Sequence, residues 1–179
     1  MAAELLLARA LQTHRGSVTE LLEQLAGEPI VADKLLQEHM VARTAGVPDN
    51  AGASRVRRVV VLRGRHSQRK FVYAEALLDI EHIPPEIVTG LATTDAPLGH
   101  LLAHNDVDVL RVQLPSVPPA PLVTDGELAH LIEEASLSRS YRLHVDGEPA
   151  IEIDEWFLPA VEEALRQRAS IAGDRDRDS

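Results

Sequence analysis

The clearest structural signal in this chain is Tyr141-Arg-Leu-His-Val145, followed by Asp146-Gly147 and by Glu148-Pro-Ala-Ile-Glu-Ile-Asp-Glu-Trp-Phe-Leu158. Asp-Gly between two segments of alternating apolar and polar residues is the preferred two-residue turn of a β-hairpin. The stretch therefore predicts two antiparallel strands. It also indicates that the rest of the chain builds on an antiparallel sheet.

The second strand of this hairpin carries a charge on its apolar face. Successive side chains of a strand point to opposite faces of the sheet. Ile151 and Ile153 are expected to face the core, so Glu155 falls on that inner face, whereas Glu152 and Asp154 point the other way. A charged group on an apolar face needs a partner or a ligand.

A second hairpin is predicted upstream. The β-branched run Arg58-Val-Val-Val-Leu62 is followed by a polar turn over 64–67 and by Phe71-Val-Tyr-Ala-Glu-Ala-Leu-Leu78. By the same parity, Arg58 shares a face with Val60, and Glu75 shares a face with Tyr73. Both hairpins thus place charged residues among apolar ones.

Two interpretations of these inward charges stay open. Arg58 and Glu155, with Glu75 as a third group, are of opposite sign, and inward charges commonly form a buried structural ion pair. The alternative is a pocket that binds a small carboxylate, because the planar fork of a guanidinium suits that group.

Helical patterns flank the two hairpins. Helices are expected over 2–14, 17–26, 84–91, 95–104, 124–135 and 159–168. Ser17 with Glu20, and Thr124 with Glu127, have the spacing of capping boxes. Residues 30–41 fit neither the helical nor the strand period cleanly, 47–54 is typical of a loop, and 107–114 alternates like a strand. The four prolines of 115–121 indicate an extended connector.

The mixed order of helices and strands predicts one α+β domain over residues 1–169, followed by a disordered charged tail over 170–179. The length of 179 residues is also that of a single domain. The N-terminal run 2–11 is apolar but interrupted by Glu4 and Arg9, so it is neither a signal peptide nor a membrane span. We expect a soluble, cytoplasmic protein.

The charge of the chain is unevenly distributed. Its 28 acidic and 18 basic residues give a formal net charge of −10, which disfavours anionic partners on average. Residues 50–74, however, contain no Asp or Glu. The basic residues of this window are Arg55, Arg57, Arg58, Arg63, Arg65, Arg69 and Lys70. The window has few aromatic neighbours, so we expect charged hairpin edges in preference to a nucleic-acid surface, and an anionic small ligand remains open.

Metal and thiol chemistry have little support in the sequence. Cysteine is absent, which excludes disulfides, thiolate zinc sites and cysteine nucleophiles. His100 and His104 are four residues apart with Asp106 beyond, but a third ligand at a clear spacing is missing. We interpret both histidines as helix-surface residues and expect no metal.

Five motifs in a fixed order carry a family resemblance. They are the Arg58-led strand, Tyr73-Ala-Glu75, Ala96-Pro-Leu-Gly99, Tyr141-Arg-Leu with its glycine hairpin, and Asp154-Glu-Trp-Phe-Leu-Pro159. Together they resemble the chorismate pyruvate-lyase (4-hydroxybenzoate synthase) family from about Ser17 to Pro159, and its actinobacterial-type branch most. The chain departs from the family at Arg139-Ser140, where two adjacent arginines are common.

The resemblance implies a cofactor-free lyase that converts chorismate to 4-hydroxybenzoate and pyruvate. The implied fold is a six-stranded antiparallel sheet with helical flaps over a buried ligand, in a monomer or weak dimer that binds neither nucleic acid nor membrane. Which hydroxybenzoate isomer or amino analogue is formed, and which biosynthetic route uses it, stays open. The alternative is a non-catalytic sensor of aromatic acids, since the same fold resembles effector-binding domains of bacterial regulators. The short segment before Arg58 holds no winged helix-turn-helix, which favours the enzyme.

The resemblance also implies roles for individual residues. Arg58 and Glu155 are the implied catalytic residues: Arg58 is expected to contact the ring hydroxyl or ether side of the ligand, and Glu155 to hydrogen-bond that hydroxyl. Whether Glu155 or the substrate's own enolpyruvyl methylene takes the ring hydrogen stays open. The backbone N–H groups of Leu98 and, on the flap, Ile30 are expected to receive the ring carboxylate. Glu75 and Arg142 are the further substrate-binding candidates, on the strength of their charge and position.

Overall fold

A computed structural model describes residues 2–14, 16–41, 54–115 and 117–175. The helices are α1 (Ala2–Thr13), α2 (Val18–Ala26), η1 (Ile80–His82), α3 (Pro85–Thr93), α4 (Leu98–His104), α5 (Gly126–Glu133) and α6 (Pro159–Arg175). The strands are β1 (Ile30–Val41), β2 (Ser54–Gly64), β3 (Lys70–Asp79), β4 (Val109–Gln113), β5 (Leu137–Val145) and β6 (Glu148–Phe157). None of these helices combines the length and apolar character needed to cross a bilayer.

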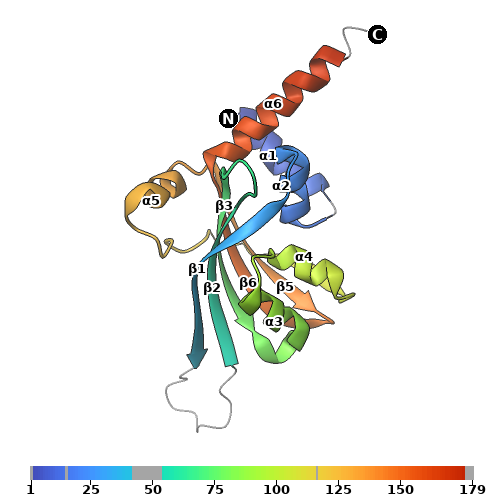
Figure 1. Cartoon of the computed structure of the whole chain (residues 1–179), viewed down its shortest axis with the longest axis vertical. Helices are drawn as coiled ribbons and strands as arrows, with labels where there is room; N and C mark the ends of the chain where they lie inside the picture. Colours follow the sequence, from blue (N-terminus) through green and yellow to red (C-terminus); the bar gives the residue numbers. More distant parts are fainter. Residues whose placement is uncertain (1, 15, 42–53, 116, 176–179) are drawn as a thin grey trace.

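The described strands form one six-stranded sheet in the order β1-β2-β3-β6-β5-β4. All neighbours are antiparallel, so two three-stranded meanders are joined through the pair β3 and β6. Both predicted hairpins are confirmed, as is the α+β class (Figure 1). The two ends of the sheet are the edge strands β1 and β4.

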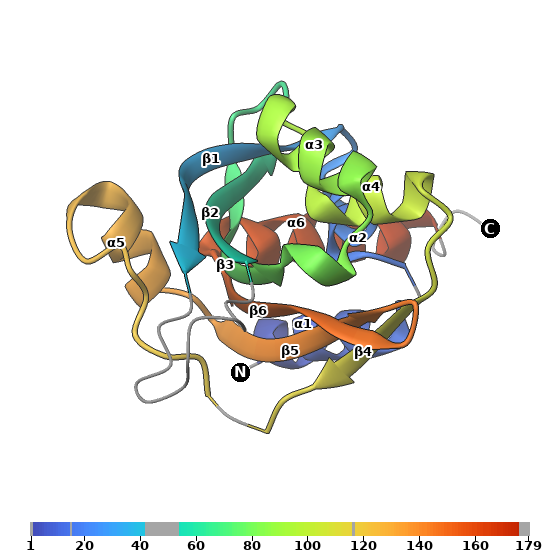
Figure 2. The same ribbon diagram turned by 90° about the horizontal axis from the view of Figure 1, so that it is seen from below.

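Helices cover both faces of the sheet. In Figure 1, α5 lies on one side of the strands, and α2, α3 and α4 lie on the other. The α5 side contains a cluster built around Val59, Tyr73 and Trp156, with Ile132 from α5. Figure 2 shows the sheet curling around α2, α3 and α4, so these helices lie on its concave side. Because helices cover both faces of the sheet, a buried side chain of a strand can lie either on the α5 side or on the concave side.

Local sequence signals account for several turns. The capping box of Ser17 and Glu20 is present with both hydrogen bonds, so the predicted start of α2 is confirmed. Asp146 and Gly147 both have positive φ, 51° and 89°, as the favoured hairpin turn requires. The predicted cap at Thr124 is wrong: α5 starts after Asp125, and no side chain caps it.

The ambiguous segment over 30–41 is the edge strand β1. A register shift between Lys34 and Leu36 interrupts its pairing with β2. Such a bulge breaks the two-residue period, which explains why the sequence pattern is mixed. The loop predicted over 47–54 falls almost wholly on residues outside the described ranges. Helix α6 continues to Arg175, past its predicted end near Arg168 and into the stretch predicted as a tail.

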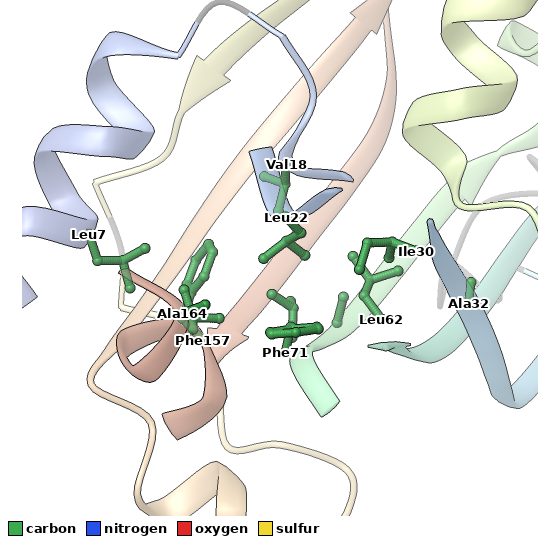
Figure 3. Packing of buried hydrophobic residues seen from close by; sticks show 12 residues of the cluster. Leu7, Val18, Leu22, Ile30, Ala32, Leu62, Phe71, Phe157 and Ala164 are labelled. Carbon is green, nitrogen blue, oxygen red and sulfur yellow. The ribbon is translucent and has the colours of Figure 1, made fainter. Parts of the chain in front are cut away.

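An apolar cluster fixes the N-terminal helices at one end of the sheet (Figure 3). Phe71 and Phe157 are fully buried there, against Leu7 of α1, Leu22 of α2 and Ala164 of α6. Fully burying an aromatic side chain of this size contributes about 2–3 kcal/mol. This packing sets the position of α2, whose first turn forms part of the cavity wall.

Candidate active site

A cavity of about 460 Å³ lies between the concave side of the sheet and the helices α2 and α4. This volume is within the range of about 300–1,000 Å³ that small-molecule sites occupy. Its apolar wall includes Val60, Leu62, Leu78, Leu102, Leu143 and Ile153. Its polar groups include Arg58, Arg111, Tyr141 and Glu155 from four strands, and Ser17, Thr19 and Glu20 from the start of α2. A mostly apolar wall with a few convergent polar groups is typical of a ligand site.

Two alanines of β3 leave the room for this cavity. Ala76 pairs with Arg58 of β2, and Ala74 pairs with Glu155 of β6. The methyl side chains therefore lie between the two charged groups, on the same face of the sheet. Larger residues at these positions would fill the space that separates Arg58 from Glu155.

Arg58 is a buried cation that has no carboxylate partner among the described residues. It is 4% exposed, and its Nη1 donates to Oε1 of Gln37 at 2.7 Å and to the carbonyl oxygen of Leu91. Its Nη2 is buried and has no hydrogen-bond partner among the described residues. Burial lowers the pKa of this guanidinium from its ordinary value. An uncompensated buried charge is costly, so an anionic ligand is the natural complement.

Apart from Arg55, which is exposed, the other basic residues of the window behave differently. Five of them form ion pairs with acidic side chains from other segments: Arg57 with Glu38, Arg63 with Asp33, Arg65 with Asp95, Arg69 with Glu163 and Lys70 with Glu127. These pairs are largely exposed at the surface. Arg58 is thus distinct from its neighbours in sequence both in burial and in partners.

Glu155 is buried on the same concave side, 4% exposed, but its charge is compensated. Arg139 Nε donates to Oε2 at 2.9 Å, and Tyr141 Oη donates to Oε1 at 2.7 Å. The inward orientations of Arg58 and Glu155 predicted from strand parity are confirmed. An ion pair between them is not what the structure contains, because the partner of Glu155 is Arg139.

Tyr141 lies at the centre of this group. Its ring is buried, and the guanidiniums of Arg111 and Arg139 each lie 4.9 Å from the ring centroid. Burial first, and Glu155 second, raise the pKa of the phenol well above its ordinary value, while the two arginines oppose this shift. Tyr141 is therefore a neutral hydrogen-bond donor at neutral pH.

Leu98 lies in the cavity wall, as expected. It is the first residue of α4 and follows Pro97, which is the N-cap. The backbone N–H of Leu98 makes no hydrogen bond to another described residue. This donor therefore has no competing partner among the described residues, in a residue that lines the cavity.

The remaining three substrate-binding predictions fall elsewhere. Glu75 points to the α5 side, where it accepts hydrogen bonds from Tyr73 Oη and from the backbone N–H of Leu122, both at 2.7 Å. Arg142 forms an exposed ion pair with Glu152, on the face opposite to Glu155. Ile30 packs in the apolar cluster.

Each of these three residues is already engaged within the fold. The N–H of Ile30 donates to Oε1 of Glu23 at 3.1 Å, so it is not free to bind a carboxylate. Glu75 attaches the proline-rich connector to the sheet, since Leu122 lies at the end of that connector. Neither Glu75 nor Arg142 lines the cavity.

Sequence reasoning missed Arg111 and Tyr141, and it gave Arg139 no contact with Glu155. Tyr141 and Arg139 were within reach, because the register of the predicted hairpin places them beside Ile153 and Glu155. Arg111 is not predicted because it alternates with Leu110 and Val112, and the apolar side of a strand is the one expected to face the core.

The two histidines of α4 have local partners. His100 Nε2 lies 3.2 Å from Oε2 of Glu23, and His104 Nδ1 lies 2.7 Å from the carbonyl oxygen of His100. Within the described ranges, no group of three His, Asp or Glu side chains is arranged to hold a metal ion.

The family model and the curated relatives that match this chain carry the same description. The family model described as "Chorismate pyruvate-lyase Rv2949c-like" matches residues 13–165. The chain is 27% identical over 161 residues to the chorismate pyruvate-lyase of Mycobacterium tuberculosis H37Rv, which covers 86% of this chain and 80% of the relative. It is 30% identical over 159 residues to that of Mycobacterium leprae, covering 86% of this chain and 74% of the relative. Among solved structures, PhnF from Mycobacterium smegmatis aligns with a TM-score of 0.48 and 15% identity, over 83% of this chain and 66% of that chain.

Proposed function

This chain belongs to the Rv2949c-like chorismate pyruvate-lyase family, and from this we propose that it removes pyruvate from chorismate and releases 4-hydroxybenzoate. The observation that carries the proposal is Arg58, a buried cation with an unpartnered Nη2 in the wall of a cavity of about 460 Å³. A small anion is the ligand that such a group requires. Chorismate supplies two carboxylates and an ether oxygen.

Three groups of the cavity are suited to orient the substrate ring. The ring hydroxyl donates to Glu155, whose oxygens each accept one hydrogen bond within the protein and can accept another. The N–H of Leu98 receives the ring carboxylate. Arg58 then lies on the ether side of the ring, with Nη2 directed at the oxygen that leaves.

The reaction breaks the carbon–oxygen bond between the ring and the enolpyruvyl group. The hydrogen on the hydroxyl-bearing ring carbon moves to the methylene carbon of the enolpyruvyl group, which becomes the methyl group of pyruvate. The ring loses one hydrogen and the ether oxygen and becomes aromatic, so the atoms balance without water or cofactor. Aromatisation provides the thermodynamic drive, and the protein has to lower the barrier.

Arg58 lowers this barrier by stabilising negative charge on the departing ether oxygen. A preorganised donor in a site shielded from water is more effective than one in solution, because no solvent has to reorganise. Removing one such donor typically costs about 10²–10³ in rate. The covering helices and the apolar wall also hold the enolpyruvyl group over the ring, which reduces the entropic part of the barrier.

Glu155 acts as a hydrogen-bond acceptor that fixes the ring, and the substrate's own methylene takes the hydrogen. The support is geometric, since Arg139 and Tyr141 each occupy one oxygen of the carboxylate. A carboxylate that accepts a hydrogen bond on each oxygen keeps one orientation. This favours a role as hydrogen-bond acceptor for the ring hydroxyl over a role as general base toward the ring carbon.

The test is to incubate the purified chain with chorismate and identify the products by mass spectrometry. We expect 4-hydroxybenzoate and pyruvate in equal amounts. A hydroxybenzoate isomer would correct the orientation of the ring, and the absence of any aromatic product would contradict the proposal. Binding of 4-hydroxybenzoate without turnover would indicate a ligand-binding domain instead of an enzyme.

A further inference from the structure

The edge strand β4 presents its charged face to the cavity and its apolar face to solvent. All five residues of β4 are exposed, but Val109 and Arg111 lie on the side that lines the cavity, whereas Leu110, which is 61% exposed, and Val112 lie on the other side. The usual pattern of a strand directs its apolar side chains toward the core and its polar ones toward solvent. The pairing of β4 with β5 thus places a guanidinium at the cavity at the expense of apolar burial.

Arg111 has no carboxylate partner. It forms no ion pair or hydrogen bond with another residue in the part of the chain that the structure describes. Its guanidinium lies over the ring of Tyr141, at 4.9 Å from the centroid, which holds it by a cation–π contact. A stacked guanidinium keeps its N–H donors free at the ring's edge, where they can bind a carboxylate in bidentate fashion.

The sheet register places Arg111 and Arg58 on either side of Glu155. One strand, β3, separates Arg58 on β2 from Glu155 on β6, and one strand, β5, separates Glu155 from Arg111 on β4. Arg58 shares a row of the sheet with Ala76, Ile153 and Tyr141, and Arg111 lies in the next row, which contains Leu143. The curl of the sheet makes β2 and β4 opposite walls of one cavity (Figure 2).

Resting on the proposed function, we propose that Arg111 binds the carboxylate of the enolpyruvyl group and so determines specificity for a dicarboxylate. The other cations near Glu155 are not placed to bind this carboxylate, because neither Arg139, whose Nε donates to Glu155, nor Arg142, which pairs with Glu152, lines the cavity. After the reaction, this carboxylate leaves with pyruvate. The aromatic product then has no group that Arg111 can bind, so the protein binds the product more weakly than the substrate.

The experiment compares Arg111→Met with a matched control, Arg142→Met. Methionine keeps an unbranched stem against Tyr141 but removes the charge. Arg142 is on the adjacent strand and outside the cavity, so its variant reports the general effect of losing one arginine. Arg111→Gln is a second uncharged variant in case the methionine variant unfolds more easily.

Three ligands separate binding from turnover. Chorismate is used for kinetics, and 4-hydroxybenzoate serves as the monocarboxylate in calorimetry. The third is 3-(1-carboxyvinyloxy)benzoate, an enolpyruvyl ether that is already aromatic and is not expected to lose pyruvate by the same route. For Arg111→Met we expect KM for chorismate and Kd for the analogue to rise roughly tenfold or more. Kd for 4-hydroxybenzoate should change less than about twofold, because Arg111 does not bind it.

Two results would overturn the inference. One is an unchanged Kd for the analogue in both Arg111 variants, and the other is an equal loss of affinity for the analogue and for 4-hydroxybenzoate. Arg142→Met should match the wild type throughout. If the wild type binds the analogue through Arg111 but does not turn over chorismate, the proposed function fails while the role of Arg111 in dicarboxylate binding stands.

Discussion

Arg58 and Glu155 line the same cavity, yet within the described ranges they form no ion pair with each other. Glu155 is compensated by Arg139 and by the phenol of Tyr141. Among the residues that the structure describes, Arg58 donates to two neutral oxygens, those of Gln37 and Leu91. The cavity therefore contains a buried anion that the fold has neutralised and a buried cation that it has not, and this buried cation is assigned to the ether side of the ligand.

The buried pair of Arg139 and Glu155 should be strongly coupled. Glu155→Gln leaves the Arg139 guanidinium, whose side chain is only 12% exposed, without its carboxylate. We expect the free energy of unfolding to fall by about 3 kcal/mol, because breaking a buried pair strands one charge. Urea unfolding of Glu155→Gln, Arg139→Met and the double variant should give a coupling energy of about 1–3 kcal/mol. Additive effects would contradict the pairing.

Arg58→Met, in contrast, should reduce ligand binding more than stability. The substitution removes a buried charge that lacks a carboxylate partner, so we expect a loss in unfolding free energy of less than about 1 kcal/mol, or a gain. Ligand binding should suffer instead, with Kd for 3-(1-carboxyvinyloxy)benzoate, which keeps the ether oxygen, rising roughly tenfold or more. Urea unfolding and calorimetry measure the two quantities. A variant that is as unstable as Glu155→Gln and still binds the ligand normally would show that Arg58 is structural.

Ala76→Leu should close the cavity. Ala76 lines the cavity and pairs with Arg58, so a longer side chain there occupies ligand space. Because the added atoms would enter the cavity and not the packed core, we expect little loss of stability together with a Kd for 4-hydroxybenzoate at least about tenfold higher. Calorimetry and thermal unfolding give both values, and Leu77→Ile on the opposite face of β3 is the control. Normal affinity in Ala76→Leu would place the ligand elsewhere.

Glu75→Gln should affect the fold but not the site. Glu75 accepts hydrogen bonds from Tyr73 and from the N–H of Leu122, on the α5 side. Loss of its charge should lower the unfolding free energy by about 1–2 kcal/mol and increase amide exchange at Leu122. Kinetic constants with chorismate should stay within about twofold of the wild type. A marked rise in KM would return Glu75 to the substrate-binding residues.

The two tyrosines of the chain should make its stability fall at alkaline pH. Burial, with Glu155 or Glu75 beside the phenol, raises the pKa of Tyr141 and of Tyr73 above the ordinary value. Both phenols are neutral in either state below about pH 10, so their contribution is fully present there. Above that pH the unfolded chain ionises first, and stability is lost until the folded pKa is reached.

Tyr141→Phe isolates one of these two contributions. In urea unfolding between pH 9 and pH 11, the variant should lose stability less steeply than the wild type, by up to about 1.4 kcal/mol per pH unit. Absorbance of tyrosinate in the native protein gives an independent check, because neither phenol should ionise near pH 10. Identical pH slopes for variant and wild type would contradict the burial of Tyr141 beside Glu155.

The sequence was most informative where a local rule specifies the geometry. The capping box at Ser17, the Asp146-Gly147 turn and the parity of Arg58 and Glu155 each depend on residues close together in the chain. Strand parity alone, however, does not show on which of the two covered faces of the sheet a charged side chain lies. Glu75 obeys the same rule as Glu155 but points to the α5 side, because the α5 helix and its connector supply a second interior there.

The remaining errors have related causes. Ile30 was assigned to ligand binding on the flap, but the packing of α2 brings Glu23 to its N–H, a contact between separate elements. Arg111 was missed because hydrophobic alternation favours Leu110 and Val112 as the inward face of β4, and the pairing with β5 reverses it. Both outcomes are set by long-range packing, which short sequence patterns do not report.

The most direct measurement is turnover of chorismate by the wild type, Arg58→Met and Arg57→Met under the same conditions. Arg57 is the adjacent arginine but pairs with Glu38 at the surface, so its variant controls for the loss of one positive charge. We predict equimolar pyruvate and 4-hydroxybenzoate from the wild type and Arg57→Met, and a rate lower by at least about 100-fold for Arg58→Met. No pyruvate from the wild type, or equal rates for all three proteins, would contradict the account.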